Sequence, residues 1–183
     1  MNHSSNLFLI GPMGAGKSSI GRRLAQHFGM RCIDLDAAIE EHTGASVAMI
    51  FEIEGETGFR RRESDLLAEL TTQQGIVLAT GGGVVLLPRN RALLREHGFV
   101  VWLETSVEQQ LQRLARDRQR PLLDAPDRRQ RLEQLAHERD PLYRELADFR
   151  IAGMDESCQH AAARIAALLE ANWQRTAPIG HTA

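Results

Sequence analysis

Cysteine is scarce in this chain of 183 residues, which contains only Cys32 and Cys158. The two are distant in sequence and belong to no C-x-x-C or mixed Cys/His pattern, so we expect reduced thiols rather than a disulfide or a zinc site. No apolar run approaches the ~18 residues that a membrane-spanning helix needs. The first residues also lack the basic and apolar regions of a signal peptide. These absences predict a soluble, cytoplasmic protein with no membrane partner.

An excess of positive charge is also missing, since 22 Lys and Arg residues are outnumbered by 24 Asp and Glu residues. A net charge of −2 gives no global field that would attract nucleic acid, and no basic stripe is interleaved with aromatics. The length and the 43% hydrophobic content suit one α/β domain with one core. We therefore expect a single domain over residues 1–175 and a disordered tail over residues 176–183.

Lysine occurs once in the chain, as Lys17. It belongs to Gly11-Pro-Met-Gly-Ala-Gly-Lys-Ser18, which has the form G-x-x-x-x-G-K-[ST] of a P-loop between an apolar run and an amphipathic segment. The glycines let backbone N–H groups approach an anion, and the positive end of the following helix adds to the attraction. Lys17 should reach the outer phosphates of a nucleotide, and the Ser18 hydroxyl should hold Mg²⁺. The alternative is a glycine-rich turn that only joins a strand to a helix.

The next expected strand, over residues 31–36, ends in two carboxylates. Ligands bind at the carboxyl ends of strands in an open parallel sheet, and alternate strand side chains share a face. Asp34 and Asp36 are therefore expected on one face of the strand and are candidates for the chemistry. The alternative is that one of them caps the helix beginning near Ala37.

Helices are expected over residues 37–43, 47–54 and 59–72, separated by Gly44 and the stretch from Gly55 to Gly58. We interpret residues 37–72 as a helical insert that covers the site and binds the substrate. It contains Arg60, Arg61 and Arg62, and arginine forks suit bidentate capture of a carboxylate. Successive helical positions point about 100° apart, so the three cannot all face one ligand. For any one of them, a solvated helix face is the alternative.

Residues 75–80 predict a buried strand that leads into Gly81-Gly-Gly83. Consecutive glycines indicate either close approach of a ligand to the backbone or a tight turn. Further strands are expected over residues 99–103 and 149–152, and helices over residues 88–97, 127–146 and 160–172. Residues 114–126, which precede the helix over residues 127–146, are charged and bounded by prolines. This composition is typical of a mobile lid or of a solvated charge run. A lid with an arginine would exclude water and add positive charge during phosphoryl transfer.

In chain order, six motifs resemble those of the shikimate kinase family. They are the P-loop with Ile20-Gly-Arg-Arg, Asp34-Leu-Asp36, Phe59-Arg-Arg, Thr80-Gly-Gly-Gly83, Arg120-Pro-Leu-Leu and Arg139-Asp-Pro-Leu-Tyr143. The resemblance covers nearly the whole chain. It implies a nucleoside-monophosphate-kinase-like fold, with three α/β/α layers and a five-stranded parallel sheet. It also implies a monomeric enzyme of chorismate biosynthesis that uses ATP and Mg²⁺ to phosphorylate the 3-hydroxyl of shikimate.

The resemblance further implies roles for individual residues. ATP would be bound by Gly14, Ala15, Gly16, Lys17, Ser18, Ser19, Arg113 and Arg120, and Mg²⁺ by Ser18 and, through water, by Asp34. Shikimate would be bound by Asp36, Arg60, Gly81, Gly82, Gly83 and Arg139, with Glu63 orienting Arg60. The catalytic residues would be Lys17, Asp34, Asp36 and Arg120. Around residues 155–158 no match to the family's adenine-contacting loop is found.

Two other functions fit a P-loop. A related small-molecule kinase such as gluconate kinase shares the motif and the general fold, but the set of Arg60, Arg139 and three glycines argues against it. A non-catalytic regulator controlled by nucleotide occupancy is the second. It would show no acceptor-dependent turnover, and the guanine-recognition pattern N-K-x-D is absent because the one lysine belongs to the P-loop.

Overall fold

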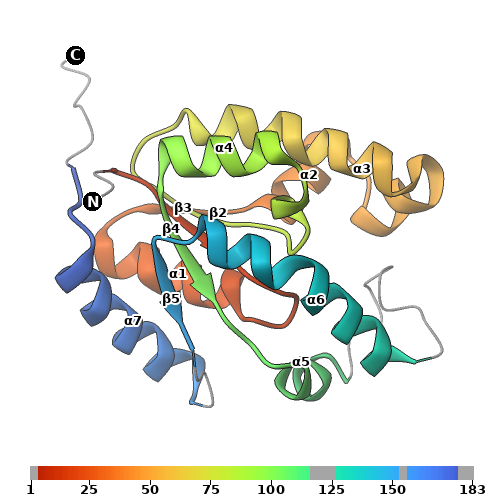
Figure 1. The fold of residues 1–183 in the computed structure, drawn as a ribbon. Helices are drawn as coiled ribbons and strands as arrows, with labels where there is room; N and C mark the ends of the chain where they lie inside the picture. Colours follow the sequence, from red (N-terminus) through yellow and green to blue (C-terminus); the bar gives the residue numbers. More distant parts are fainter. Residues whose placement is uncertain (1–3, 116–126, 153–155, 177–183) are drawn as a thin grey trace.

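A five-stranded parallel sheet lies between layers of helices in the computed structural model, which describes residues 4–115, 127–152 and 156–176 (Figure 1). The strand order is β2-β3-β1-β4-β5, and every neighbouring pair is parallel. The strands are β1 (Leu7–Ile10), β2 (Arg31–Asp34), β3 (Ile76–Ala79), β4 (Phe99–Leu103) and β5 (Phe149–Ile151). The predicted fold class is therefore confirmed.

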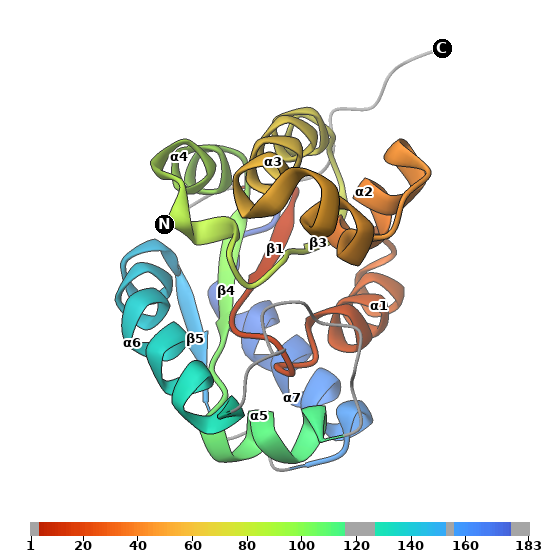
Figure 2. The ribbon, with the colours of Figure 1, turned by 90° about the vertical axis from the view of Figure 1, so that its right-hand side faces the viewer.

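The helices pack on both faces of this sheet, with α1 and α7 on one face and α2, α3, α4 and α6 on the other (Figure 2). Their bounds are α1 Lys17–Phe28, α2 Leu35–Thr43, α3 Val47–Thr71, α4 Pro88–His97, α5 Val107–Leu114, α6 Arg128–Leu146 and α7 Cys158–Asn172, with a 3₁₀ turn η1 at Val84–Leu86. None of the helices in these described ranges is long and apolar enough to cross a bilayer.

The central strand β1 has a continuously apolar sequence because both of its faces are buried. Leu7 and Leu9 pack into the core beneath α1 and α7, whereas Phe8 and Ile10 pack into the core beneath α3, α4 and α6. Side chains alternate between the faces of a strand, and a parallel sheet covered on both sides buries both sets. All four side chains are fully buried, so this strand fixes the position of the P-loop that follows it.

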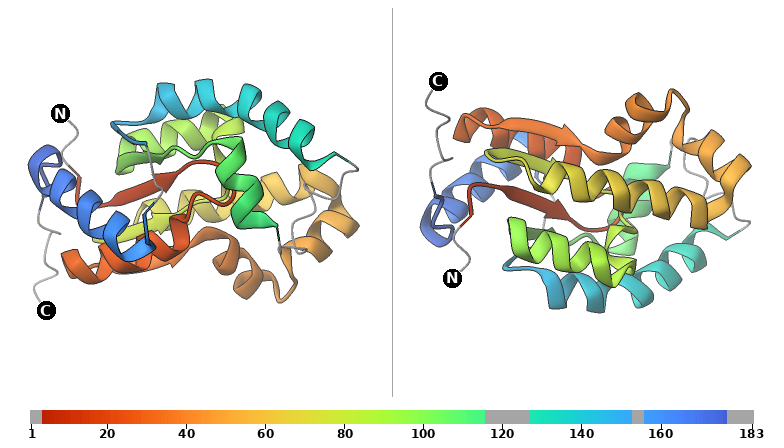
Figure 3. Two further views of the ribbon diagram at one scale, coloured as in Figure 1. Left: turned by 90° about the horizontal axis from the view of Figure 1, so that it is seen from below. Right: turned by 90° about the horizontal axis from the view of Figure 1, so that it is seen from above.

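The helical insert has the break that the sequence predicts and differs in where the second helix begins. Residues 47–54 and 59–72 were expected as separate helices, and α3 consists of two helical parts that meet at a kink at Gly55, so that residues 56–58 are helical as well. Gly55 has φ 68° and ψ −178°, a backbone conformation open almost only to glycine. The bent end of α3 projects beyond the sheet, on the side where the strands end (Figure 3). Arg120, the rest of segment 116–126 and tail residues 177–183 lie outside the described ranges.

At the opposite, amino end of the sheet, Asn6 joins three segments. Its Nδ2 donates hydrogen bonds to the carbonyl oxygens of Gln73 (2.7 Å) and His97 (3.1 Å). Its Oδ1 accepts one from the backbone N–H of Ile76 at 3.2 Å. Asn6 is 3% exposed, so it supplies these backbone groups with partners in a place that water hardly reaches, although the His97 carbonyl oxygen also accepts a hydrogen bond from the Ser4 hydroxyl at 3.0 Å.

Replacing Asn6 by Ala should therefore lower the free energy of unfolding by about 2 kcal/mol, because the buried N–H of Ile76 and the carbonyl oxygen of Gln73 lose the Asn6 side chain as a partner. Urea denaturation followed by circular dichroism measures this. Asn172→Ala is the matched control, since its amide bonds Leu168 at an exposed position of α7. The control should change stability by less than about 0.5 kcal/mol. Equal losses in the two variants would contradict the role given to Asn6.

Candidate active site

Three loops meet where β1, β2 and β3 end. The P-loop follows β1, the start of α2 follows β2, and Gly81–Gly83 follow β3. Because the strands are parallel and adjacent, their carboxyl ends lie at one edge of the sheet, the usual position of ligand sites in such folds. The bent end of α3 and the amino-terminal half of α6 flank this edge (Figure 3).

The P-loop has the conformation of an anion cradle. Gly14 and Gly16 have φ of 77° and 83°, in the left-handed region that favours glycine, and α1 begins directly after them at Lys17. The backbone N–H groups at the start of α1 and the helix dipole favour a bound anion. Lys17 is buried, and its Nζ donates to the carbonyl oxygens of Gly11 (2.7 Å) and Pro12 (2.8 Å). The lysine ammonium is thereby held over the loop.

Asp34 makes two kinds of contact, one with the P-loop helix and one that confirms the capping role considered from the sequence. Its Oδ2 accepts a hydrogen bond from the Ser18 hydroxyl at the start of α1. Its Oδ1 accepts bonds from the backbone N–H groups of Asp36 (3.1 Å) and Ala37 (3.2 Å), which caps α2. A hydroxyl and a carboxylate in contact are hard oxygen donors of the kind that Mg²⁺ binds.

The expectation that Asp34 and Asp36 share one face of a strand is wrong. β2 ends at Asp34, and Asp36 lies in the first turn of α2, because the capping carboxylate of Asp34 begins the helix two residues earlier than predicted. Asp36 still reaches the site. A Cβ added at Gly81 would lie 3.0 Å from Oδ1 of Asp36 and 2.7 Å from Oε1 of Glu63. Gly81 therefore lets two carboxylates approach the backbone.

Arg60 is the arginine of the insert that faces the site. It is 8% exposed, and its Nη1 donates to Oε2 of Glu63 at 2.8 Å. A Cβ at Gly83 would overlap the Arg60 guanidinium, which explains why glycine is needed there. Arg62 instead pairs with Glu54, and Arg61 is exposed. As the helix geometry predicted, the three arginines do not face one ligand.

Glu63 neutralises Arg60 from within the protein. Its side chain is fully buried, and burial raises the pKa of its carboxyl against the lowering effect of Arg60. Its Oε1 has no hydrogen-bond partner in the described part of the chain and points toward Gly81. A buried carboxylate oxygen without a donor is costly, so a ligand hydroxyl at this position would be stabilising.

Arg139 brings a second buried guanidinium from α6. It is 4% exposed, its Nε lacks a hydrogen-bond partner among the described residues, and the carboxylate of neighbouring Glu138 lies 3.9 Å from that Nε. Burial lowers the pKa of Arg139, and the positive charge of Arg60 lowers it further. Two like charges buried close together would be stabilised by a shared anion.

Tyr143 supports this arrangement and was not assigned a role from the sequence. It lies one helical turn after Arg139 on α6, fully buried, and its hydroxyl donates to the carbonyl oxygen of Gly82. Burial raises the pKa of Tyr143, so the hydroxyl stays protonated and acts as a donor. The i, i+4 spacing was the signal in the sequence, since such residues share a helix face.

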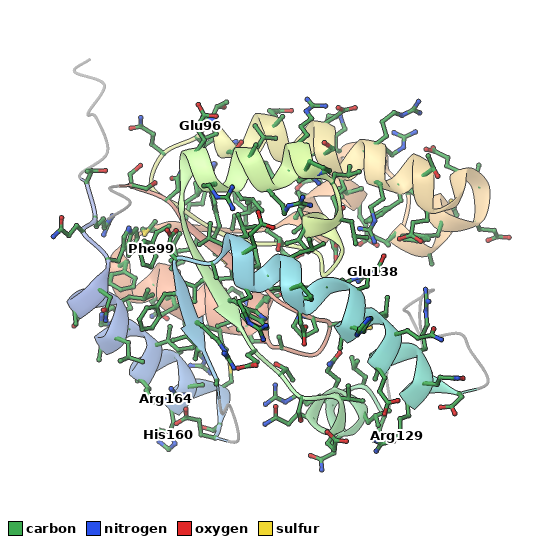
Figure 4. The ribbon with its side chains drawn as sticks, viewed as in Figure 1. Glu96, Phe99, Arg129, Glu138, His160 and Arg164 are labelled. Carbon is green, nitrogen blue, oxygen red and sulfur yellow. The ribbon has the colours of Figure 1, made fainter. Side chains whose placement is uncertain are left out.

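Of the residues expected to bind the nucleotide, all except Arg120 lie in the described ranges. Ala15 is buried, whereas the Ser19 side chain is exposed. Arg113 on α5 donates from Nη1 to the carbonyl oxygen of Gly14 at 3.0 Å, beside the P-loop. An ion pair of Arg129 with Glu108 (2.8 Å) joins α6 to α5 (Figure 4). The described residues hold no group of three or more potential His, Cys, Asp or Glu metal ligands, and a Mg²⁺ site that shares its ligands with phosphates and water needs none.

A P-loop at the end of the central strand, a Ser–Asp pair beside it and two buried arginines near the same sheet edge are the features of a P-loop kinase. The family model for shikimate kinase matches residues 13–170. Shikimate kinases of Vibrio cholerae serotype O1 and Stenotrophomonas maltophilia are both 53% identical, over 93% and 96% of this chain and 98% and 97% of theirs. The chain belongs to the shikimate kinase family, and it is an ATP-dependent phosphotransferase.

Solved structures agree with this assignment. The structure of a shikimate kinase from Acinetobacter baumannii in complex with shikimate matches with a TM-score of 0.90 and 47% identity, over 92% of this chain and 94% of that one. A shikimate kinase from Bacteroides thetaiotaomicron has a TM-score of 0.82 at 29% identity, over 90% of this chain and 98% of its own.

Arg139→Met should make the free protein more stable, by about 1 kcal/mol, because it removes a buried charge that faces another while keeping similar volume. The midpoint of urea denaturation without ligand measures this. Arg144→Met, at an exposed position of the same helix, is the control and should shift stability by less than about 0.5 kcal/mol. A clear loss of stability in Arg139→Met would show that the guanidinium is already neutralised within the protein.

Proposed function

We propose that this chain transfers the γ-phosphoryl group of ATP to the 3-hydroxyl of shikimate, giving ADP and shikimate 3-phosphate for aromatic amino acid biosynthesis. The observation that carries the proposal is the buried pair of Arg60 and Arg139, which lies at the same sheet edge as the P-loop of a shikimate kinase family member. The relative from Acinetobacter baumannii was solved with shikimate. We take the chain to work as a cytoplasmic monomer.

On the acceptor side, the guanidinium groups of Arg60 and Arg139 would bind the shikimate carboxylate. Gly81, Gly82 and Gly83 would line the pocket with backbone, and a side chain at position 81 or 83 would press on the Arg60–Glu63 pair or on Asp36. Asp36 would accept hydrogen bonds from the hydroxyl groups, including the attacking one. Together these contacts fix the acceptor at both ends, which is how binding energy lowers the entropic cost of reaction.

On the donor side, the N–H groups of the P-loop with Lys17 would hold the phosphates of ATP. Ser18 and, through water, Asp34 would hold Mg²⁺, which would neutralise phosphate charge during transfer. The contact between the Ser18 hydroxyl and Asp34 fits that ion. Arg113 would pack on the adenine. Arg120, in the segment outside the described ranges, would add positive charge to the transferring group.

The chemistry asks for positioning more than covalent catalysis. Phosphoryl transfer passes through a loose transition state, so the attacking hydroxyl needs in-line placement and does not need early loss of its proton. Asp36 can orient that hydroxyl and accept the proton late in the step. Preorganised donors at the P-loop would stabilise the charge that grows on the phosphate oxygens.

The experiment that tests this function is ADP release from ATP and Mg²⁺, measured with and without shikimate and with gluconate as the matched acid. Release that depends on shikimate alone is expected. Release with gluconate alone would favour the related kinase, and acceptor-independent binding without turnover would favour a regulator.

Arg139→Ala should mainly raise the KM for shikimate, and a normal KM in that variant would remove its assigned role.

Asp34→Asn separates the metal role of this residue from its structural one. Asparagine is as good an N-cap as aspartate, so α2 should keep its start and the unfolding midpoint should hardly change. The lost charge weakens the site for a hard cation, so we expect kcat to fall by about 10- to 100-fold and the Mg²⁺ concentration at half-maximal rate to rise. A Mg²⁺ titration of ADP release measures both, and an unchanged requirement for Mg²⁺ would contradict the assignment.

A further inference from the structure

Glu56 is hydrogen-bonded to the edge of the Arg60 guanidinium that is best suited to binding a carboxylate ligand. Its Oε1 accepts hydrogen bonds from Nη2 of Arg60 at 3.1 Å and from Nε at 3.3 Å. Nε and one Nη nitrogen form an edge of the guanidinium that binds a carboxylate with two parallel bonds. No sequence motif assigned a role to Glu56.

The two carboxylates on Arg60 differ in exposure. Glu63 holds Nη1 with a side chain that is 0% exposed, whereas the Glu56 side chain is 45% exposed. Breaking the pair with Glu63 would leave a buried charge without its partner, which is strongly unfavourable. The pair with Glu56 lies at the solvent boundary, where ion pairs are weak and their members can be solvated separately. Arg60 therefore has one permanent carboxylate partner and one that can be exchanged.

Glu56 also acts on the second arginine of the site. Burial is the main influence on the pKa of Arg139 and lowers it, while the Glu56 carboxylate is among the charges that raise it. One carboxylate thus bonds Arg60 and interacts with Arg139. A small acid bound between the two guanidinium groups would make the same kind of interactions.

The backbone at this point provides a bend next to the exchangeable group. Gly55, with its glycine-specific conformation, directly precedes Glu56. A second ion pair crosses the same bend, because Glu54 accepts bonds from Nε (2.9 Å) and Nη2 (2.6 Å) of Arg62. The Glu54–Arg62 pair joins the two halves of α3 without contacting Arg60. It can hold the bend while Glu56 is released, and it supplies a matched control.

We propose that Glu56 is an internal stand-in for the acceptor carboxylate, holding the Nε and Nη2 edge of Arg60 until the acceptor displaces it. The inference rests on the proposed function, because it requires Arg60 to bind the acceptor. It has two consequences. Arg60 keeps its orientation and a partner in the free enzyme, and every binding event must first break the pair with Glu56. Glu56 is therefore a positioning residue that lowers the apparent affinity for the acceptor.

The test is the steady-state kinetics of Glu56→Gln, which keeps the shape of the side chain and removes its charge. We expect the KM for shikimate to fall two- to fivefold, the range that an exposed ion pair supplies, with kcat and the KM for ATP unchanged. Glu54→Gln removes the neighbouring ion pair across the same bend and should leave the KM for shikimate at the wild-type value. Circular dichroism of both variants checks that α3 is kept.

A ligand without the carboxylate separates competition from a change in the fold. The analogue of shikimate with a hydroxymethyl group in place of the carboxylate should bind wild type and Glu56→Gln equally, as measured by calorimetry. An equal gain for this analogue, an equal effect of Glu54→Gln, or a KM for shikimate that stays or rises in Glu56→Gln would overturn the inference.

The proposed function and the role of Glu56 fail on different results. If wild type shows no shikimate-dependent ADP release, the proposed function fails and the stand-in with it. If wild type turns over and the KM of the variant does not fall, only the stand-in fails.

Discussion

The buried ion pair of Arg60 with Glu63 is the interaction on which the acceptor side of the site depends. Both groups are nearly inaccessible to water, so each keeps its charge at low cost only while the other is present. The pair lies directly against the loop after β3, and glycine at positions 81 and 83 is what leaves it room. The sheet fixes the loop, and the pair fixes Arg60 against the loop. The orientation of the guanidinium thus follows from packing rather than from the ligand.

Much of the donor side could be predicted from the sequence, because its signals are local. The P-loop spacing specifies a backbone shape, and the apolar run before Gly11 places that shape at the end of a buried strand. The five-stranded parallel sheet follows from apolar runs of strand length alternating with helical patterns. Asp34 lies in contact with Ser18 of the P-loop, as its position after a neighbouring strand predicted. The error concerned Asp36, since strand periodicity was extended past the residue whose side chain caps α2. A carboxylate that can cap a helix marks a boundary that periodicity alone does not reveal.

The acceptor side of the site was harder to predict from the sequence, because its contacts join residues that are distant in sequence. The three consecutive glycines could be explained either by a ligand that approaches the backbone closely or by a tight turn, and the sequence did not decide between them. The structure shows that protein side chains approach as well: Glu63 and Asp36 at Gly81, Tyr143 at Gly82 and Arg60 at Gly83. No local pattern assigns such partners. Glu56 was missed for a related reason. A glutamate four residues before an arginine usually indicates a solvated helix pair, and only the burial of Arg60 distinguishes this one.

The site as a whole therefore concentrates positive charge that the protein neutralises incompletely. Glu63 compensates Arg60 and Glu56 compensates it again, but Arg139 has a buried Nε without a hydrogen-bond partner in the described ranges. A fold selected for stability alone would replace such a group with a hydrophobic side chain, as the cost of buried charge implies. Its presence supports the proposed role in acceptor binding, because an anionic acceptor would supply the missing charge when it is bound. Under this proposal the unfavourable interaction that weakens the free protein would become affinity for the acceptor, and the exchangeable carboxylate of Glu56 would set how much of that affinity is expressed.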